Sequence, residues 1–337
     1  MSAHASTPCR SRAFHSVHCS SKGFGAAPSS SSSSSQPKSK SSSRGKKKSG
    51  RSKESKSLVD AENIGTPPTS FALARSSARR LLATDCTSKQ NLRVSVELPL
   101  RDSSPKAVAD VVARILLPDE DNQKCILTRG VDALVLFRTN EAAQRFLDDV
   151  PSSLANDVNA LAFSDAAGEG SAADDLSPPA VLVMAGWTPS QFLEDKDEAL
   201  ALLEEASGAR REEGRSLTNL VVILDGSPVN DEEKKALDET MWPVYSYFPV
   251  EAALPFPLMG QTVRAAILCE SGTWATFAES PNEGKTWTRT STSNTRPNDT
   301  DVELVLMNAA AARSAVTNAA KKGKGVFDNL FGGGKKP

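Results

Sequence analysis

Histidine is nearly missing from this sequence. Its 337 residues include three, and all of them, His4, His15 and His18, stand close to the N-terminus. Removal of an N-terminal segment would leave a mature protein without imidazole, which excludes Ser-His-Asp catalysis, Cys-His catalysis and His-ligated zinc together. Any acid–base chemistry would fall to Asp, Glu, Lys, Tyr or Cys side chains, and we assign no catalytic residue, no metal site and no bound cofactor.

Other absences narrow the class of protein further. The five cysteines form no CxxC pair and are widely spaced, which indicates reduced thiols; Cys269, at the end of an expected strand, is expected to be the most exposed of the last three. Neither GxxxxGK[ST] nor a strand-linked GxGxxG occurs, so the two common phosphate-binding loops are missing. No apolar run reaches about 18 residues, and we expect no transmembrane segment.

Acidic residues are scarce at the N-terminus. Residues 1–57 contain 21 Ser and 12 Lys and Arg but a single acid, Glu54. This composition is typical of a transit peptide followed by a Ser/Lys-rich disordered leader, and no apolar stretch suggests a secretory signal. The alternative is that the basic cluster at 44–53 is a nuclear address or a nucleic-acid-binding arm.

The remainder of the chain has the opposite charge. Taking the leader from the totals of 40 basic and 41 acidic residues leaves 28 and 40 for residues 58–337. An acidic body makes nucleic acid an unlikely partner, because phosphate binding needs a surplus of Lys and Arg. From the transit-peptide composition of the leader, we expect a chloroplast protein, in the stroma or on the stromal face of the thylakoid.

The hydrophobic pattern predicts four regions: the leader, a linker at 58–90 with a short helix at 70–82, one domain at 91–315, and a flexible basic Gly/Lys tail at 316–337. Within the domain, alternation at 92–98 predicts a half-buried strand, and Ser104-Pro105 begins a helix. Further apolar runs of strand length alternate with helical patterns. The expected strands are 133–137, 180–184 and 219–224, and the expected helices are 139–147, 197–206 and 231–239.

This alternation predicts an α/β fold, a mostly parallel sheet with helices on both faces. The stretch at 165–179 is expected to be a loop. Four short strand patterns then follow with no helix between the last three, and they predict antiparallel strands at one edge of the sheet: 244–248, 262–269, 273–278 and 286–290. Asn298 is expected to cap a last helix.

Ligands of parallel sheets usually bind beyond the carboxyl ends of the strands. Asn140, Gly186, Trp187, Asp225 and Gly226 follow the predicted strands there. The first glycine could let the backbone approach a phosphate, the indole could stack on a ring, and the carboxylate could hold a hydroxyl or a metal. The alternative is that both glycines only permit turns and that the aspartate caps one.

Large aromatic side chains gather in the later half of the chain, where Tyr245 and Trp274 are candidates for a binding face. Packing of the core is the other explanation for such a cluster.

The same half resembles a plastid family of plants and algae, the domain of unknown function numbered nineteen-ninety-five, which includes the low photosystem II accumulation proteins. The resemblance covers about residues 90–315 and adds Arg296 to the candidate binding residues. It is carried by Pro243-Val244-Tyr245-Ser246-Tyr247-Phe248-Pro249, Gly260, Gly272-Thr273-Trp274, Trp287 and Arg296-Pro297.

The resemblance implies plastid residence and, for some members, a role in photosystem II assembly or accumulation; others carry a related domain fused to an adenylate kinase. It supplies no catalytic residues. The function expected is that of a non-catalytic plastid binding protein, soluble or peripheral, with photosystem II subunits or thylakoid assembly machinery as partners. The alternative is a nucleotide-handling or other small-molecule enzyme that uses the carboxyl-end loops.

Overall fold

The computed structural model describes residues 64–87, 89–118, 124–167, 176–253, 262–279 and 287–313. The expected leader, the expected tail and Gly260 lie outside these residues. The elements are α1 (Phe71–Thr87), β1 (Arg93–Leu98), α2 (Pro105–Leu116), β2 (Ala133–Phe137), α3 (Asn140–Asp149), β3 (Val158–Ala162), α4 (Phe163–Ala166), β4 (Val181–Trp187), α5 (Pro189–Glu212), β5 (Asn219–Asp225), α6 (Asp231–Thr240), β6 (Trp242–Ala253), β7 (Thr262–Glu270), β8 (Thr273–Glu279), β9 (Trp287–Ser293) and α7 (Asp299–Arg313).

The described strands form one nine-stranded sheet in the order β3-β2-β4-β5-β1-β6-β7-β8-β9. β1 to β6 pair in parallel, and β6 to β9 pair antiparallel. The predicted α/β class is confirmed, as are the antiparallel strands at one end. β6 joins the two halves, because it pairs parallel with β1 and antiparallel with β7.

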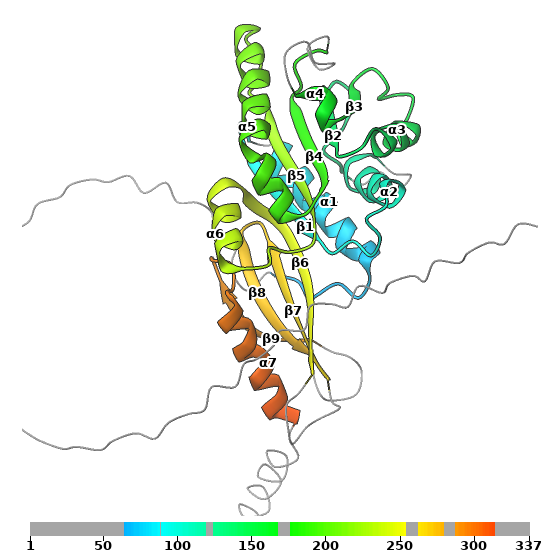
Figure 1. The fold of residues 1–337 in the computed structure, drawn as a ribbon. Helices are drawn as coiled ribbons and strands as arrows, with labels where there is room; N and C mark the ends of the chain where they lie inside the picture. Colours follow the sequence, from blue (N-terminus) through cyan, green and yellow to red (C-terminus); the bar gives the residue numbers. More distant parts are fainter. Residues whose placement is uncertain are drawn as a thin grey trace, which may run out of the picture. The chain divides into compact units, whose positions relative to one another are not determined.

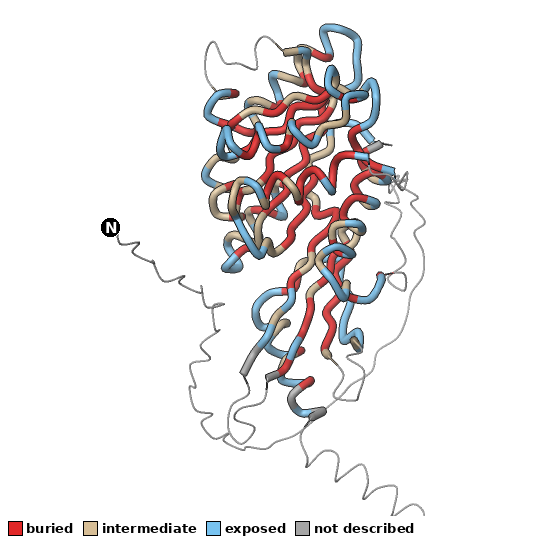
Figure 2. Tube along the Cα trace, turned by 90° about the vertical axis from the view of Figure 1, so that its right-hand side faces the viewer, coloured by how far each residue is buried: buried red, intermediate tan, exposed pale blue. Residues whose placement is uncertain are grey.

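Helices cover both faces of the parallel half (Figure 1). Alternate residues of each strand point to opposite faces: Val135 and Val183 pack with α1, α2 and α3, whereas Leu136 and Met184 pack with α4, α5 and α6. The strands are therefore buried on both sides, which explains their continuous apolar runs. Figure 2 shows this buried layer running through the sheet.

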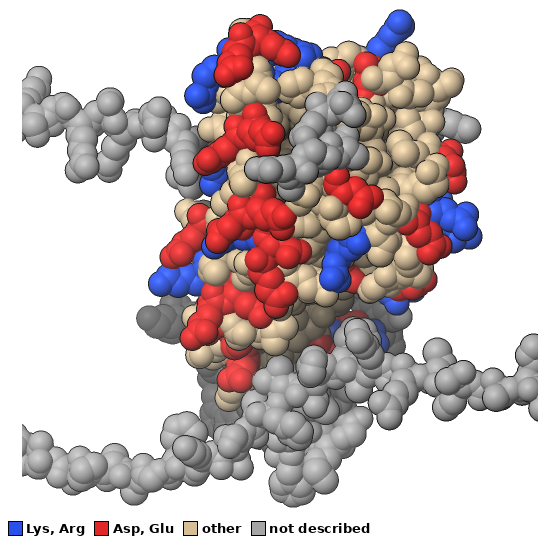
Figure 3. Space-filling model, turned by 45° about the horizontal axis from the view of Figure 1, so that its top comes forward, with Lys and Arg blue, Asp and Glu red and all other residues tan. Residues whose placement is uncertain are grey.

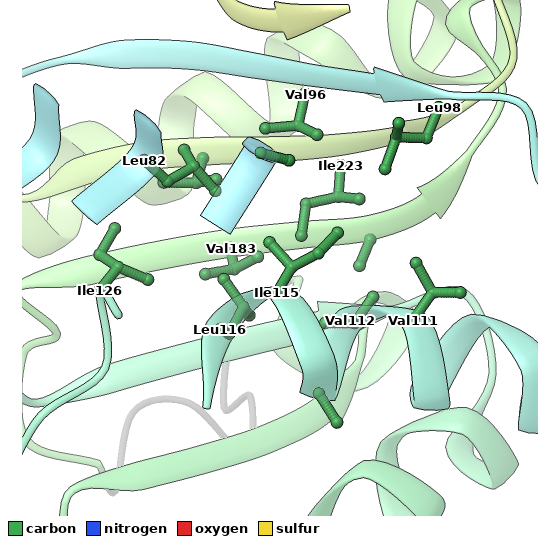
Figure 4. Close-up of a cluster of buried hydrophobic side chains, with 14 of the residues drawn as sticks. Leu82, Val96, Leu98, Val111, Val112, Ile115, Leu116, Ile126, Val183 and Ile223 are labelled. Atoms are coloured by element: carbon green, nitrogen blue, oxygen red, sulfur yellow. The ribbon is translucent and has the colours of Figure 1, made fainter. Parts of the chain in front are cut away.

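The α2 face illustrates how the sequence encodes the packing. Ser104 accepts a hydrogen bond from the Ala107 N–H at 3.3 Å and so caps the helix, with proline as its first residue. The buried side of α2 then recurs at helical spacing. Figure 4 shows this side against the strand residues Val96, Val183 and Ile223, with side chains from Val111, Val112, Ile115 and Leu116.

Four expectations need revision. The helix expected at 70–82 is α1, whose buried Ala74, Ala78 and Leu82 belong to the main core, so the folded body includes part of the expected linker. β3 and α4 were not predicted, because Val158–Ala162 is short and weakly apolar. The helix expected at 197–206 begins earlier, where Thr188 and Gln191 form a capping box. β1 is buried on both faces rather than on one.

The expected cap of the last helix is confirmed. The Asn298 side chain accepts from the Asp301 N–H at 2.9 Å, and the Asp301 carboxylate accepts from the Asn298 N–H at 3.1 Å. α7 places Val305 and Ala309 against β7 and β8. None of the described helices has the length and apolar character needed to cross a membrane.

Candidate functional site

Two crevices at the carboxyl edge of the parallel sheet have the topology of a ligand site. β1 and β5 are neighbours, but α2 packs on one face of the sheet and α6 on the other. β2 and β4 are neighbours as well, with α3 and α5 on opposite faces. Such topological switch points are where open α/β sheets bind ligands.

The β1/β5 crevice is closed by Asp225. One carboxylate oxygen accepts from the Leu100 N–H at 3.0 Å, and the other accepts from the Ser103 hydroxyl at 2.6 Å. Gly226, at φ +92°, donates its N–H to the Leu98 carbonyl at 2.9 Å. Both residues hold the β1–α2 connection against the end of β5.

At the β2/β4 crevice, Gly186 is required by the backbone and by packing. Its φ is +89°, and a Cβ atom there would lie 2.9 Å from the Val108 Cγ1 atom of α2. A β-bulge between Ala185 and Trp187 accompanies it. Gly186 is therefore a bulge residue inside β4 that packs against α2, and it does not lie in a turn.

Trp187 forms the floor of this crevice. Its side chain is only 1% exposed, and its Nε1–H donates to the Asp195 carboxylate of α5 at 2.8 Å. The Phe163 ring meets it edge-on, with 5.5 Å between ring centroids. The indole is therefore fixed in the core with its one polar group already bonded.

Above this floor lies a cavity of about 360 Å³. It is bounded by the end of β2, by α4, by the end of β4 and by the first turns of α5. Asn140 is not among the lining residues; it is exposed at the start of α3, next to the N-cap Thr139. The lining residues are Arg138, Phe163, Ser164, Ala167, Trp187, Asp195 and Glu198.

Arg296 and Trp274 lie elsewhere, on the sheet face that carries α7. The Arg296 guanidinium donates to both oxygens of Glu97 at 2.6 and 2.7 Å, and also to Asp238 of α6 at 2.7 Å. It lies over the Trp274 ring, 4.4 Å from the centroid. Glu97 is fully buried and the Arg296 side chain is 6% exposed. This cluster ties the β9–α7 connection to β1 and α6.

Its ion pairs explain why the buried Arg296 side chain stays charged. Burial alone lowers the pKa of Arg296, but its hydrogen bonds and attraction to Glu97 and Asp238 outweigh burial and raise the pKa overall. Sequence reasoning missed Glu97, which the alternation in β1 placed on the solvent side. Its partner is 199 residues away, and the Arg-Pro pair at 296–297 was the only signal near it.

The remaining candidates are buried. Tyr245 is 1% exposed, and burial, followed by the charge of Glu270, raises its pKa. Cys269 was expected to be the most exposed of the last three cysteines, and this was wrong: it is 0% exposed, because its side chain packs with Phe248 and Trp274. Burial, followed by the charge of Glu97, raises the pKa of its thiol well above the ordinary value.

The eight candidate residues therefore occupy four places. Asn140, Gly186 and Trp187 lie at the β2/β4 crevice, and Asp225 and Gly226 lie at the β1/β5 crevice. Tyr245 packs in the main core, and Trp274 and Arg296 form the cluster with Glu97. Within the described segments, no group of three or more His, Cys, Asp or Glu side chains is placed to hold a metal ion.

A further polar feature escaped the sequence reasoning. Carboxylates recur along α5 on the side opposite its buried Ala199 and Leu203, and Figure 3 shows acidic side chains in a band down the left of the view. The spacings of four, seven and seven residues keep them on one helix face. We call this set the α5 acidic stripe, and it consists of the exposed Glu194, Glu198, Glu205 and Glu212.

Comparison with known proteins adds no assignment: neither a scan against protein-family models nor a search of curated proteins found a match.

Proposed function

We propose that this chain is a non-catalytic binding protein of the plastid that holds a partner with a Lys/Arg-rich surface against the α5 acidic stripe. The stripe is the observation that carries this proposal. Its four glutamates form no ion pair with any described residue. Photosystem II subunits or their assembly machinery are the partners that the sequence resemblance suggests.

The spacing of the stripe has an energetic cost, which supports a role in binding. Glu194 and Glu198 are four residues apart, where like charges destabilise a helix by about 0.2–0.5 kcal/mol. No described Lys or Arg offsets this repulsion. A basic partner removes it on binding and is also steered to the surface by the acidic field.

The strand ends support binding over catalysis. Asp225 uses both oxygens to hold the β1–α2 connection, and Trp187 gives its N–H to Asp195. The groups best placed for chemistry are thus engaged by the protein itself. The exposed charges that stay free suit recognition.

Co-purification tests the proposal. The wild-type chain and the triple variant Glu194→Gln, Glu205→Gln, Glu212→Gln are used as baits on solubilised thylakoids at low and high salt. We expect the wild type to retain photosynthetic subunits at low salt, and the variant to lose most of them. Recovery of no photosynthetic subunit by the wild type would contradict the partner class, and equal recovery by the variant would contradict the surface.

The compartment is tested separately. N-terminal sequencing of the protein isolated from cells should find the leader removed within residues 20–60. An intact leader would favour the nuclear or nucleic-acid alternative.

The second candidate is a small-molecule enzyme that uses the carboxyl-end loops, and the cavity above Trp187 favours it. Nucleotides fit this cavity poorly, because Asp195 and Glu198 outnumber Arg138 and repel phosphate. A thermal-shift screen decides the point, since a ligand at 100 times its dissociation constant adds about 2.7 kcal/mol. No shift with any nucleotide leaves the nucleotide-handling idea without support.

A further inference from the structure

The cavity above Trp187 is lined by charges of both signs that come from different elements. Arg138 follows β2, while Asp195 and Glu198 belong to the first turns of α5. No ion pair joins the arginine to either carboxylate within the described part of the chain. Charges that do not neutralise each other across a cavity are available to a ligand that carries both signs.

One end of the cavity favours an anion. Arg138 is exposed and has no ion-pair partner among the described residues. It directly precedes Thr139, the N-cap of the ten-residue α3. The positive end of that helix dipole adds to the guanidinium, which can also bind a carboxylate through two parallel hydrogen bonds.

The α5 side favours a cation. Asp195 accepts the Trp187 N–H with one carboxylate oxygen, and its other oxygen has no described donor. Glu198, one turn along, is exposed and lines the same cavity. The edge-on rings of Trp187 and Phe163 lie below them. An ammonium group here would meet two carboxylates above an apolar floor.

We propose that this cavity binds a small zwitterion of the α-amino-acid type, with its carboxylate at Arg138 and its ammonium at Asp195 and Glu198. The volume of about 360 Å³ is at the lower end of the usual range for small-molecule pockets, which fits a ligand of this size. Its place at the β2/β4 switch point is where an open α/β sheet binds ligands. The site goes beyond the proposed partner binding.

The test uses the full-length chain and the individual L-amino acids at millimolar concentration, followed by tryptophan fluorescence and thermal shift. For each amino acid that binds, its amide removes the carboxylate and its N-acetyl derivative removes the ammonium. We expect each derivative to bind about tenfold more weakly, the ratio that corresponds to about 1.4 kcal/mol for one lost charged contact.

Variants assign the two ends. Arg138→Gln should weaken the parent amino acid about tenfold and abolish its advantage over the amide. Glu198→Gln should abolish part of its advantage over the N-acetyl derivative. Glu204→Gln is the matched control, because it removes an exposed carboxylate of α5 that lies outside both the cavity lining and the α5 acidic stripe, and it should leave amino-acid affinity unchanged.

Three results would overturn the proposal. The first is that no amino acid shifts either signal, and the second is that the derivatives bind as well as the parent. The third is that Glu204→Gln weakens binding as much as Glu198→Gln, which would indicate a general field effect. Arg138 is not part of the α5 acidic stripe, so failure of the Arg138→Gln variant leaves the partner-binding proposal standing.

Discussion

Replacing Arg296 with methionine should remove about 3–5 kcal/mol from the free energy of unfolding. Methionine keeps much of the length of the side chain but removes the two guanidinium nitrogens that donate to Glu97. That carboxylate is 0% exposed, and its remaining described contact is the Ser95 hydroxyl, which donates at 3.3 Å. A buried charge left without its partner costs about this much.

The expected loss of stability depends on the burial of the Arg296–Glu97 pair as much as on its hydrogen bonds. Arg114 and Asp110 form an i,i+4 pair at 3.0 Å with side chains 61% and 48% exposed. Exposed pairs of this kind contribute about 0.3–0.5 kcal/mol. Arg114→Met is therefore a matched control, and we expect it to lower stability by less than about 1 kcal/mol.

A double variant separates the charge from the packing. In Arg296→Met combined with Glu97→Leu, no buried charge is left unpaired, and replacing a whole buried pair by apolar residues is often close to neutral. We expect the double variant to be more stable than Arg296→Met alone. The double variant also keeps the reasoning testable if the single variant does not fold.

The assay is urea unfolding followed by far-UV circular dichroism. Tryptophan fluorescence is not used, because the Arg296 substitution changes the surroundings of Trp274 and hence its fluorescence. The reasoning would be refuted if Arg296→Met lost no more stability than Arg114→Met. It would also be refuted if the double variant were no more stable than the single one.

Three further predictions concern stability. Gly186→Ala should cost about 2–3 kcal/mol, because alanine at φ +89° is strained and its Cβ would crowd Val108; Gly226→Ala, with a similar φ and open space, should cost about 1 kcal/mol in the same urea assay. Asp225→Ala should cost about 1–3 kcal/mol, since a backbone donor and a hydroxyl lose their acceptor, whereas an unchanged urea midpoint would contradict that role. Burial, followed by the charge of Asp85, raises the pKa of Cys86 from 9.0 to about 12. The contribution of the protonated thiol to the free energy of unfolding is therefore fully present below about pH 9 and is lost as pH rises toward about 12. The free energy of unfolding should fall in this window by about 1.4 kcal/mol per pH unit from this thiol, and an equal slope in Cys86→Ala would exclude it as the source.

Sequence patterns located the elements whose signals are local. The parallel strands are continuous apolar runs because both faces are covered, and the helices begin at capping residues such as Ser104 and Asn298. In the antiparallel half, short turns between β7, β8 and β9 indicated the pairing. The strand runs, the helix caps and the strand pairing all depend on residues that lie close together in the sequence.

Two of the features that sequence reasoning missed depend on distant partners. The alternation in β1 predicted that Glu97 faces solvent, but the β9–α7 connection brings Arg296 over it from 199 positions away. Cys269 ends a strand, yet that strand lies inside the sheet, and the turn after it bonds back to β6 through the Ser271 and Gly272 N–H groups. The α5 acidic stripe could have been found from sequence, since glutamates at four- and seven-residue spacing share one helix face.

The contacts at the carboxyl edge of the sheet limit the chemistry that its side chains can perform. A general base must lie within reach of the substrate, and the two hydrogen bonds that Asp225 accepts hold its carboxylate against the β1–α2 connection. Arg138, Asp195 and Glu198 are the described charged groups that line the cavity, and none of them has a described ion pair. An arginine in a protein is not deprotonated, so among these groups proton transfer would fall to the two α5 carboxylates. The described charges at this edge of the sheet therefore fit the binding of a ligand with groups of both signs, as proposed above.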